Sequence, residues 1–292
     1  MTPRLALNGE VGSGGAETQL RDSSQSCEGS SLVECSPTTE QPGNETVTHL
    51  KQPPNCISIG FSGIICIADE NTIVKHPKAN PRDDSYNQML RDMILNERLI
   101  YERLGAHKGI ISYLGIHDQT SGEIRLAYAK QGDLQRYIQS HDAPSEASRA
   151  SWIQSLVKTF WYIYYRKVLH QDVKPNNILV DGGALKVTDF ANSEMHALDV
   201  DMEEICANDP LSRVDILGLG CIIYSIAAWR VFYYDYFEDE RWPEQENLPG
   251  TCGLIYEDIA NKCWRDSYVT IKSLYEDFND LTRGVTCEER MD

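Results

Sequence analysis

The pattern of apolar and polar positions changes once along the chain, close to residue 54. Before this point Ser, Thr, Gly, Glu and Pro predominate, large apolar residues are few, and there is no helical or strand period. After it, apolar residues recur in segments long enough for helices and strands. We therefore expect a disordered tail over residues 1–54 and a folded body from about residue 55.

The folded body begins with the segment CISIGFSGIICIADENTIVKHP, whose apolar positions predict two strands. The β-branched residues that favour strands here are Ile65, Ile67, Ile73 and Val74. The polar run Asp69-Glu70-Asn71 supplies turn residues between them. The pattern predicts an antiparallel hairpin.

Three later segments have the pattern of helices. Residues 85–104 carry apolar residues at helical spacing among charged ones, which predicts an amphipathic helix that ends near Gly105. The segment SWIQSLVKTFWYIYY repeats apolar positions every three or four residues. The segment RVDILGLGCIIYSIAAW is apolar nearly all round, which predicts a helix at the centre of a core.

The composition supports a folded protein and argues against one that binds nucleic acid. A hydrophobic content of 41% in 292 residues supports one large folded domain or two modest ones. The net charge of −17 and a pI near 4.8 argue against nucleic acid as a partner, because the field of the protein would repel phosphodiester backbones.

Cysteine usage and hydropathy indicate the compartment. The nine cysteines are scattered without a C-x-x-C pair, which indicates reduced thiols rather than disulfides or a zinc site. The first residues lack an apolar stretch of signal-peptide length, and the longest nearly apolar run, 217–229, is too short to cross a bilayer. We expect an intracellular protein, cytoplasmic or nuclear, without membrane insertion.

The segment VLHQDVKPNNILV concentrates polar side chains that could act together on a nucleotide. Phosphoryl transfer needs a carboxylate that orients a hydroxyl nucleophile, an ammonium that meets the transferred group, and an amide oxygen that holds a metal. Asp172, Lys174 and Asn177 supply these three groups within a short loop. Further along, Asp189 follows another apolar segment and could be a second metal ligand.

The order HQDVKPNN followed by TDFA resembles the catalytic loop and metal-binding signature of eukaryotic-type Ser/Thr protein kinases, H-R-D-x-K-P-x-N and D-F-G. The resemblance covers residues 55–285, and the short domain is also similar to the compact kinase-like proteins of filamentous fungi. It implies an α+β, bilobal protein-kinase-like fold. A small β-rich N-lobe with one key helix would span about 55–126, a larger α-helical C-lobe about 130–285, and a short tail 286–292.

The resemblance also implies roles for single residues. Asp172 and Lys174 would be catalytic, and Asn177 and Asp189 would hold Mg²⁺. His170 would be a structural histidine of the catalytic loop rather than a base.

The resemblance further implies the ATP-binding residues. Lys75 in NTIVKHP would pair with Glu97 and meet the α and β phosphates. The other implied nucleotide contacts are Ser58, Gly60, Gly63 and Ile65 in the glycine-rich loop, Ile73 over the adenine, Ala127 and Ala129 in the hinge-like LAYAKQGDL, and Leu179 as the floor.

Several positions depart from the family pattern. Ser58 replaces the first glycine of the phosphate-covering loop, and Ala191 replaces the glycine of D-F-G. Gln171 replaces the arginine of H-R-D, so activation by a loop phosphate is not expected. The segment from Asp189 to Asp215 is short and lacks A-P-E, and CWRDSYVTIKSL lacks the usual R-P, which predicts loss of the ion pair that joins these two elements.

Three functions fit these features. An active Ser/Thr protein kinase is favoured by the complete residue set and by Lys174, which kinases of tyrosine usually lack. A pseudokinase acting as a nucleotide- or protein-binding module is suggested by the departures. A small-molecule phosphotransferase of the aminoglycoside kind is the third function, although that family tends to carry His at the position of Lys174.

Partners are indicated less directly, and the sequence does not indicate an oligomeric state. Residues 192–212 carry six Asp and Glu and no Lys or Arg, so in the family's fold these carboxylates would lie beside a docked protein substrate and favour basic peptides. A solvated acidic loop without substrate contact is the alternative. The aromatic run VFYYDYF, residues 231–237, is interpreted as a loop packed beneath the large helix rather than as a docking patch.

Overall fold

The computed structural model describes residue 53 and residues 55–288, with side chains described up to residue 283. The chain divides into two units, Met1–Leu50 and Lys51–Asp292, and the described residues belong to the second. The tail predicted over residues 1–54 therefore lies outside the described residues, except for residue 53.

An antiparallel sheet of five strands forms the first part of the described chain. Its order is β1-β2-β3-β5-β4, built from β1 (Cys56–Ile59), β2 (Gly63–Ile67), β3 (Thr72–Pro77), β4 (Tyr113–Asp118) and β5 (Glu123–Ala127). The hairpin predicted around residues 69–71 is present as β2 and β3. The prediction of two strands in this segment was wrong, because a tight turn in which the Gly60 N–H donates to the Gly63 carbonyl at 2.9 Å separates β1 as a third.

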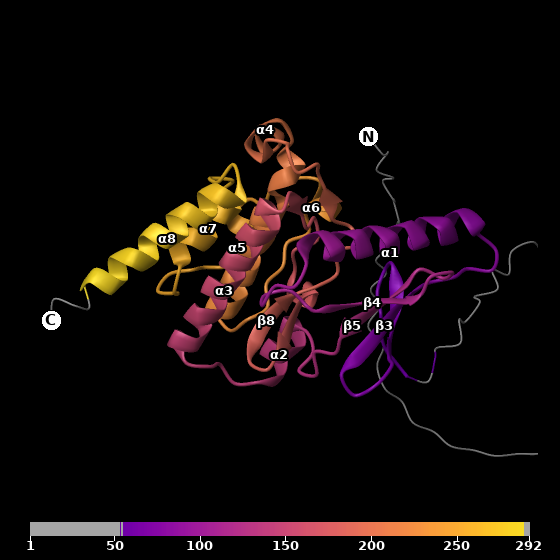
Figure 1. The fold of residues 1–292 in the computed structure, drawn as a ribbon. Helices are drawn as coiled ribbons and strands as arrows, with labels where there is room; N and C mark the ends of the chain where they lie inside the picture. Colours follow the sequence, from indigo (N-terminus) through magenta and orange to yellow (C-terminus); the bar gives the residue numbers. More distant parts are fainter. Residues whose placement is uncertain (1–52, 54, 289–292) are drawn as a thin grey trace, which may run out of the picture. The chain divides into compact units, whose positions relative to one another are not determined.

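Helix α1 (Asp84–Leu104) confirms the predicted amphipathic helix and lies along the sheet (Figure 1). It begins where the Asp83 carboxylate accepts the Tyr86 N–H, and it ends at Gly105, whose φ of 65° suits glycine. Leu90 and Ile94 on its inner face are fully buried. The same face carries Glu97, a carboxylate with 0% exposure that lies between the buried Ile94 and Ile100.

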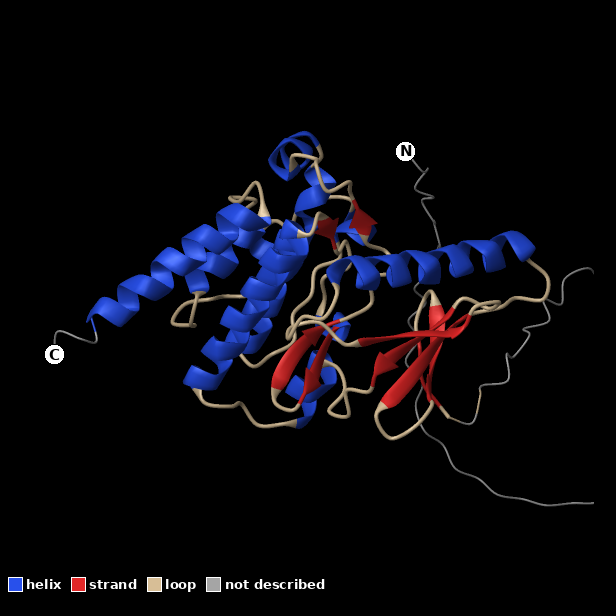
Figure 2. Ribbon diagram, in the orientation of Figure 1, coloured by secondary structure: helices blue, strands red, loops and turns tan. Residues whose placement is uncertain are grey.

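Helices dominate the rest of the described chain, as Figure 2 shows. They are α2 (Leu134–Ser140), α3 (Glu146–Tyr165), α4 (Met202–Asn208), α5 (Val214–Ala227), α6 (Tyr236–Asp239), α7 (Glu257–Trp264) and α8 (Ile271–Glu288). Single 3₁₀ turns are η1 (Pro175–Asn177), η2 (Pro210–Arg213) and η3 (Gln245–Asn247). Helix α8 continues to Glu288, past the boundary at 285 that the sequence suggested.

Two short strand pairs lie among these helices and carry the loops of interest. Strand β6 (Val168–Leu169) pairs with β9 (Glu194–Met195), and β7 (Ile178–Asp181) pairs with β8 (Ala184–Val187). The segment between β6 and β7 contains the residues predicted to be catalytic, and Asp189 follows β8. The two pairings therefore bring these two segments to one place.

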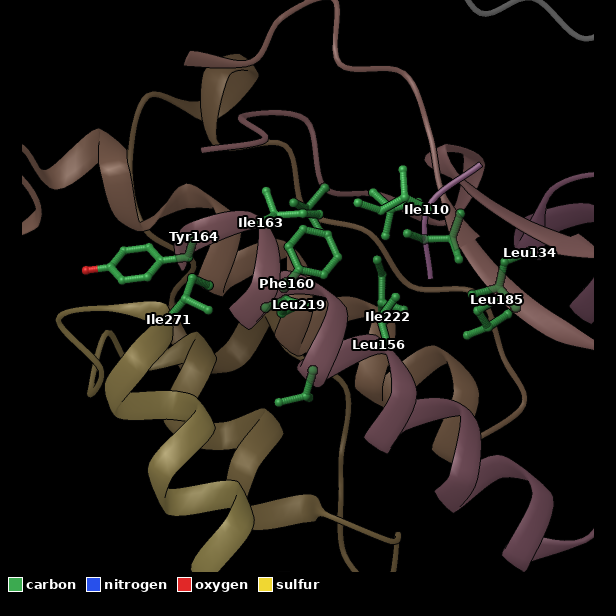
Figure 3. Close-up of a cluster of buried hydrophobic side chains, with 14 of the residues drawn as sticks. Ile110, Leu134, Leu156, Phe160, Ile163, Tyr164, Leu185, Leu219, Ile222 and Ile271 are labelled. Carbon is green, nitrogen blue, oxygen red and sulfur yellow. The ribbon is translucent and has the colours of Figure 1, made fainter. Parts of the chain in front are cut away.

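Helix α5 is the centre of the helical core, as its sequence predicted. Each of its residues is buried, and Leu219 and Ile222 pack with Phe160 of α3 in the cluster drawn in Figure 3. Its glycine at 218 allows a very close approach, because a Cβ there would lie 2.3 Å from the carbonyl oxygen of Val173. Helix α5 thus touches the backbone of the predicted catalytic loop.

The stretch Pro210–Ala227 is the one helical stretch of the described residues that is long and apolar enough to cross a membrane. Its mean hydropathy is 1.4, and 83% of it is buried inside the folded chain. Burial against protein explains its apolar composition.

The aromatic run after α5 packs largely inward, as predicted. Phe232, Tyr234 and Tyr236 pack on a small cluster that contains Trp264, whereas Tyr233 and Phe237 are exposed. The alternation shows that this loop covers the end of α5.

Candidate active site

Lys75 lies between two carboxylates that come from distant parts of the chain. Its Nζ is 2.7 Å from Glu97 Oε2 on α1 and 2.7 Å from Asp189 Oδ1 beyond β8. Strand β3 holds Lys75 opposite Ile65 and Ile124, so its ammonium is fixed beneath the sheet. The side chains of Lys75 and Glu97 are almost fully buried, while that of Asp189 is 36% exposed. The sequence-predicted pair is therefore present, and a third member joins it.

The electrostatics of this triad keep the lysine charged. Burial alone would lower the pKa of Lys75, but the carboxylates of Asp189 and Glu97 outweigh it and raise this pKa above its ordinary value. Burial raises the pKa of Glu97 to about 7, assisted by the charge of Asp189 and opposed by Lys75. Burial also opposes ionisation of Asp189, but Lys75 lowers its pKa overall. An ammonium and a more exposed carboxylate thus face the site.

The catalytic-loop residues predicted from the sequence lie together. Lys174 Nζ is 2.8 Å from Asp172 Oδ1, and the Asn177 amide donates to both the carbonyl and Oδ2 of Asp172, each at 2.9 Å. The Asp172 side chain is 17% exposed and that of Lys174 is 34% exposed. Because the amide nitrogen of Asn177 is used in this way, its Oδ1 is left as a potential metal ligand.

Asp215, near the beginning of α5, fixes the start of this loop. Its carboxylate accepts the backbone N–H of His170 and of Gln171, each at 2.6 Å. Burial raises the pKa of Asp215, and the two N–H groups and His170 oppose that rise. The resemblance to protein kinases implies that His170 lies near Asp215, as observed, but the sequence does not indicate these two backbone hydrogen bonds.

The histidine of the loop has a structural position, in agreement with its sequence interpretation. His170 Nε2 is 3.0 Å from the Thr188 carbonyl, and Nδ1 accepts the Asp172 N–H at 3.3 Å. These two contacts require the tautomer that carries its proton on Nε2. The imidazole is therefore fully used in holding the backbone.

A row of rings connects α1 to this loop. Tyr113 and Tyr101 are stacked with centroids 5.8 Å apart, Tyr101 meets Phe190 edge-on at 5.1 Å, and Phe190 lies 4.9 Å from His170. The sequence analysis missed Tyr101. Its position one helical turn after Glu97 places both on one face of α1, and this spacing could have indicated it.

Comparison with known proteins agrees with this geometry. The family model of the protein kinase domain matches residues 65–290 of this chain. The chain belongs to the protein kinase family. The predicted α+β fold, with a β-rich part followed by a helical part, is confirmed.

Individual relatives are Ser/Thr kinases of distant sequence. The 3-phosphoinositide-dependent protein kinase 1 of Rattus norvegicus is 25% identical over 151 residues, which are 46% of this chain and 27% of the rat protein. The mitogen-activated protein kinase kinase kinase MST11 of Pyricularia oryzae is 29% identical over 170 residues, which are 50% of this chain and 18% of the relative. The serine/threonine-protein kinase PDK1 of Cryptococcus neoformans is 27% identical over 140 residues, which are 41% of this chain and 11% of the relative. The chain thus spans less than a third of each of these three proteins.

The glycine-rich loop of this kinase domain is the β1–β2 hairpin. Ser58 on β1 lies opposite Ile65 on β2, and Gly60 and Gly63 flank the turn. Ser58 and Gly60 are exposed, Gly63 is buried and Ile65 is half-buried. The four residues predicted to cover the phosphates are therefore brought together.

The residues predicted to enclose the adenine belong to one hydrophobic cluster. Ile73 and Ala129 are buried in it, and Ile65, Ala127 and Leu179 pack against it. Ala129 is 6% exposed and its carbonyl accepts the Gly132 N–H, while its own N–H has no hydrogen-bond acceptor among the described residues. This N–H is therefore available to donate to a ligand.

The segment between Asp189 and Asp215 is ordered by contacts of its own. Ser193 is buried and its hydroxyl donates to the His170 carbonyl at 2.8 Å, while Asn96 of α1 donates to the Ser193 carbonyl at 2.8 Å. The Ala191 carbonyl is a further, longer acceptor for Asn96 at 3.4 Å. Gln171, in the place of the usual arginine, is buried and its amide is 3.4 Å from the Leu211 carbonyl.

The sequence predicted loss of the usual ion pair between the end of this segment and the region after α7, but a different ion pair joins them. Arg213 Nη2 lies 3.2 Å from Asp266 Oδ2, which joins η2 to the residue just after α7. The sequence analysis had expected no ion pair between these elements, and it missed this one because both partners lie outside the usual motif.

The six carboxylates of residues 192–212 differ in their roles. Asp201 caps α4, Asp209 caps η2, and Glu203 pairs with Lys272 at 2.5 Å. Asp199 and Glu204 are exposed, and Glu194 lies 3.7 Å from His196 Nε2. Four of the six carboxylates, Asp201, Asp209, Glu203 and Glu194, thus have partners within the folded chain.

Proposed function

We propose that this chain transfers a phosphoryl group from ATP to Ser or Thr hydroxyls of protein substrates. The observation that carries the proposal is Lys75, held at 2.7 Å from both Glu97 and Asp189. An ammonium fixed in this way is preorganised to receive phosphate oxygens without moving. The complete set of catalytic side chains around it supports catalysis rather than binding alone.

The chain's own groups divide the work. The Asp172 carboxylate, partly exposed and held by Lys174 and Asn177, would accept a hydrogen bond from the substrate hydroxyl and take its proton. The Lys174 ammonium would stabilise the charge that develops on the transferred group. Lys75 would hold the remaining phosphates, and the N–H of Ala129 would donate to the adenine edge.

The donor set fits Mg²⁺ bound with a nucleotide. Asn177 Oδ1 and the second oxygen of Asp189 are hard oxygen ligands, and Mg²⁺ commonly takes only one or two protein ligands together with substrate phosphates. Among the described residues no group of three or more His, Cys, Asp or Glu could hold a metal by itself, which agrees with a site completed by the nucleotide. When bound, the ion would neutralise charge on the phosphates.

The choice of Ser and Thr is supported by two findings. Lys174 lies 2.8 Å from Asp172, as the Ser/Thr resemblance implies, and a relative of this chain is named a serine/threonine-protein kinase.

The test is direct measurement of phosphoryl transfer. Purified chain with Mg-ATP should phosphorylate itself or mixed basic proteins, and Asp172→Asn should reduce the rate at least ~10²-fold while ATP binding persists. Asp142→Asn, at an exposed position between α2 and α3, is the matched control and should leave the rate unchanged. Equal inactivity of wild type and Asp172→Asn with both Mg²⁺ and Mn²⁺, with ATP bound by both, would instead identify a pseudokinase. Transfer to an aminoglycoside but not to protein would identify the small-molecule phosphotransferase.

We propose in addition that substrates with Arg or Lys near the acceptor are preferred. Asp199 and Glu204 are exposed carboxylates of the segment that would lie beside a docked peptide, whereas Glu203 is engaged with Lys272. Each exposed pairing contributes only about 0.2–1 kcal/mol and weakens with salt. A positional peptide library should therefore select basic residues modestly, and Asp199→Asn with Glu204→Gln should flatten the selection. A flat or acidic preference of the wild type would contradict this substrate class.

A further inference from the structure

A cavity of about 570 Å³ lies in the helical part of the chain. Its walls come from η2, from the stretch between α6 and η3, and from the end of α7. The volume is in the range of pockets that enclose a small ligand or a few side chains of a peptide. No residue proposed for phosphoryl transfer lines it, so its occupant need not be a nucleotide.

One side of this pocket is aromatic. Tyr236 and Trp242 meet edge to face with centroids 5.5 Å apart, and Leu248 continues the apolar wall. Rigid rings of this kind anchor aromatic or other apolar side chains at low entropic cost. The Trp242 indole N–H is buried, and among the described residues it has no hydrogen-bond partner. A ligand that brings an acceptor would satisfy it.

The other side of the pocket is charged. Two arginines, Arg213 and Arg265, and one carboxylate, Asp266, line it, so the lining is net positive in a chain whose net charge is −17. Arg213 Nη2 pairs with Asp266 Oδ2 at 3.2 Å, but Arg213 Nε and Asp266 Oδ1 are buried without partners in the described part of the chain. Arg265 is exposed, and its Nε donates to Gln245 Oε1 at 3.2 Å.

The donors and acceptors of this lining match a peptide. Trp242 keeps an unpaired N–H and Asp266 an unpaired carboxylate oxygen, both buried at the lining in the described part of the chain. A small shift of these side chains would expose them to a peptide backbone, which carries one C=O and one N–H per residue. Because the Arg265 guanidinium uses only its Nε–H in the bond to Gln245, its other N–H groups can donate to a carboxylate side chain.

We propose that this pocket binds an acidic peptide segment of a partner protein, in which an Asp or Glu pairs with Arg265 and a neighbouring aromatic side chain packs against Tyr236 and Trp242. The pocket borders the catalytic loop. Arg213 precedes Asp215 by two residues, and the Leu211 carbonyl of η2 accepts from Gln171. A bound segment would therefore keep its protein close to the proposed phosphoryl-transfer site. The binding itself uses no nucleotide and does not depend on phosphoryl transfer.

The test is selection of displayed random hexapeptides on the whole chain without ATP. Wild type should enrich sequences in which Asp or Glu lies next to an aromatic residue, and synthetic copies should lose roughly tenfold in affinity when the acid becomes an amide. Arg265→Gln should abolish the enrichment, and Trp242→Phe, which keeps an aromatic ring but removes the N–H, should weaken it. Arg241→Gln, an exposed arginine that does not line the pocket, is the charge-matched control and should select as wild type does.

The outcomes separate the other possible occupants. Asp172→Asn should select the same peptides as wild type, so failure of the kinase assay would leave this inference standing. Enriched sequences without acidic residues, or the same sequences on Arg265→Gln, would overturn the proposal. Displacement of the selected peptide by equimolar inorganic phosphate would assign the pocket to a simple anion instead. A dimer in sedimentation that Arg265→Gln dissociates would assign it to a second copy of the chain.

Discussion

Asn177 donates two hydrogen bonds from one amide nitrogen to Asp172, to its backbone carbonyl and to its carboxylate, each at 2.9 Å. The residue proposed as a metal ligand is thereby also the residue that orients the catalytic carboxylate. Loss of this side chain should impair both functions at once.

The first prediction follows from this double role. Asn177→Ala should reduce the rate of phosphoryl transfer at least ~10²-fold and raise the Mg²⁺ concentration needed for half-maximal rate. The adjacent Asn176 is exposed, and Asn176→Ala should behave as wild type. Steady-state rates over a Mg²⁺ titration provide the measurement. A normal Mg²⁺ dependence in Asn177→Ala would remove Asn177 from the metal site.

The second prediction concerns pH. Because the pKa of Glu97 is raised to about 7, its contribution to the free energy of unfolding is fully present below its ordinary pKa and is lost as pH rises through about 7. The free energy of unfolding of wild type relative to Glu97→Gln should therefore fall by about 1–3 kcal/mol between pH 5 and pH 8. Glu102→Gln, which removes a 45% exposed carboxylate from the same helix, is the control for loss of a negative charge from α1. Denaturant unfolding at several pH values measures it, and a difference that rises with pH would contradict the burial argument.

The third prediction concerns the row of rings. Tyr101→Leu removes the contacts with Tyr113 and Phe190 and should lower the free energy of unfolding by about 1–3 kcal/mol, because a buried ring is replaced by a smaller side chain. Leu99→Ala, at a position 39% exposed on the same helix, should cost much less. We also expect Tyr101→Leu to reduce activity more than its fraction of unfolded protein explains, since Phe190 adjoins Asp189. Equal activity per folded molecule would show that the row only stabilises the fold.

The fourth prediction concerns control by phosphorylation. Ser193 is buried and donates to the His170 carbonyl, and Gln171 lacks the positive charge that would bind a phosphate. Phosphatase treatment of purified protein should therefore leave activity unchanged. A large loss on dephosphorylation, mapped by mass spectrometry to a site between Asp189 and Asp215, is the outcome that this geometry does not allow.

The sequence predicted the elements that have a strong period and the residues that have a strong motif. Helix α1 ended at Gly105 as expected, and the apolar composition of α5 correctly indicated its central position. Lys75 and Glu97 were predicted as a pair because the family resemblance fixes their order along the chain. Their contact with Asp189 depends on tertiary packing, which local spacing does not encode.

The features that the sequence did not predict depend on contacts between distant segments. The split of β1 from β2 depends on one turn hydrogen bond at Gly60, which apolar spacing does not show. The Arg213–Asp266 pair joins residues that belong to no motif, so no pattern marks them as partners. The same holds for Trp242, whose unused N–H becomes evident only when the loop around it is folded.

The close packing of the catalytic loop against α5 restricts the motion of the loop. The amide protons of His170 and Gln171 are bound to a carboxylate inside the core, and Gly218 leaves no space between the helix and Val173. Hydrogen exchange at these two amides should therefore require global unfolding, whereas the exposed turn of the β1–β2 hairpin should exchange by local opening. Structural change during turnover would then be confined to the β1–β2 hairpin over the nucleotide. The catalytic loop would remain as rigid as the core itself.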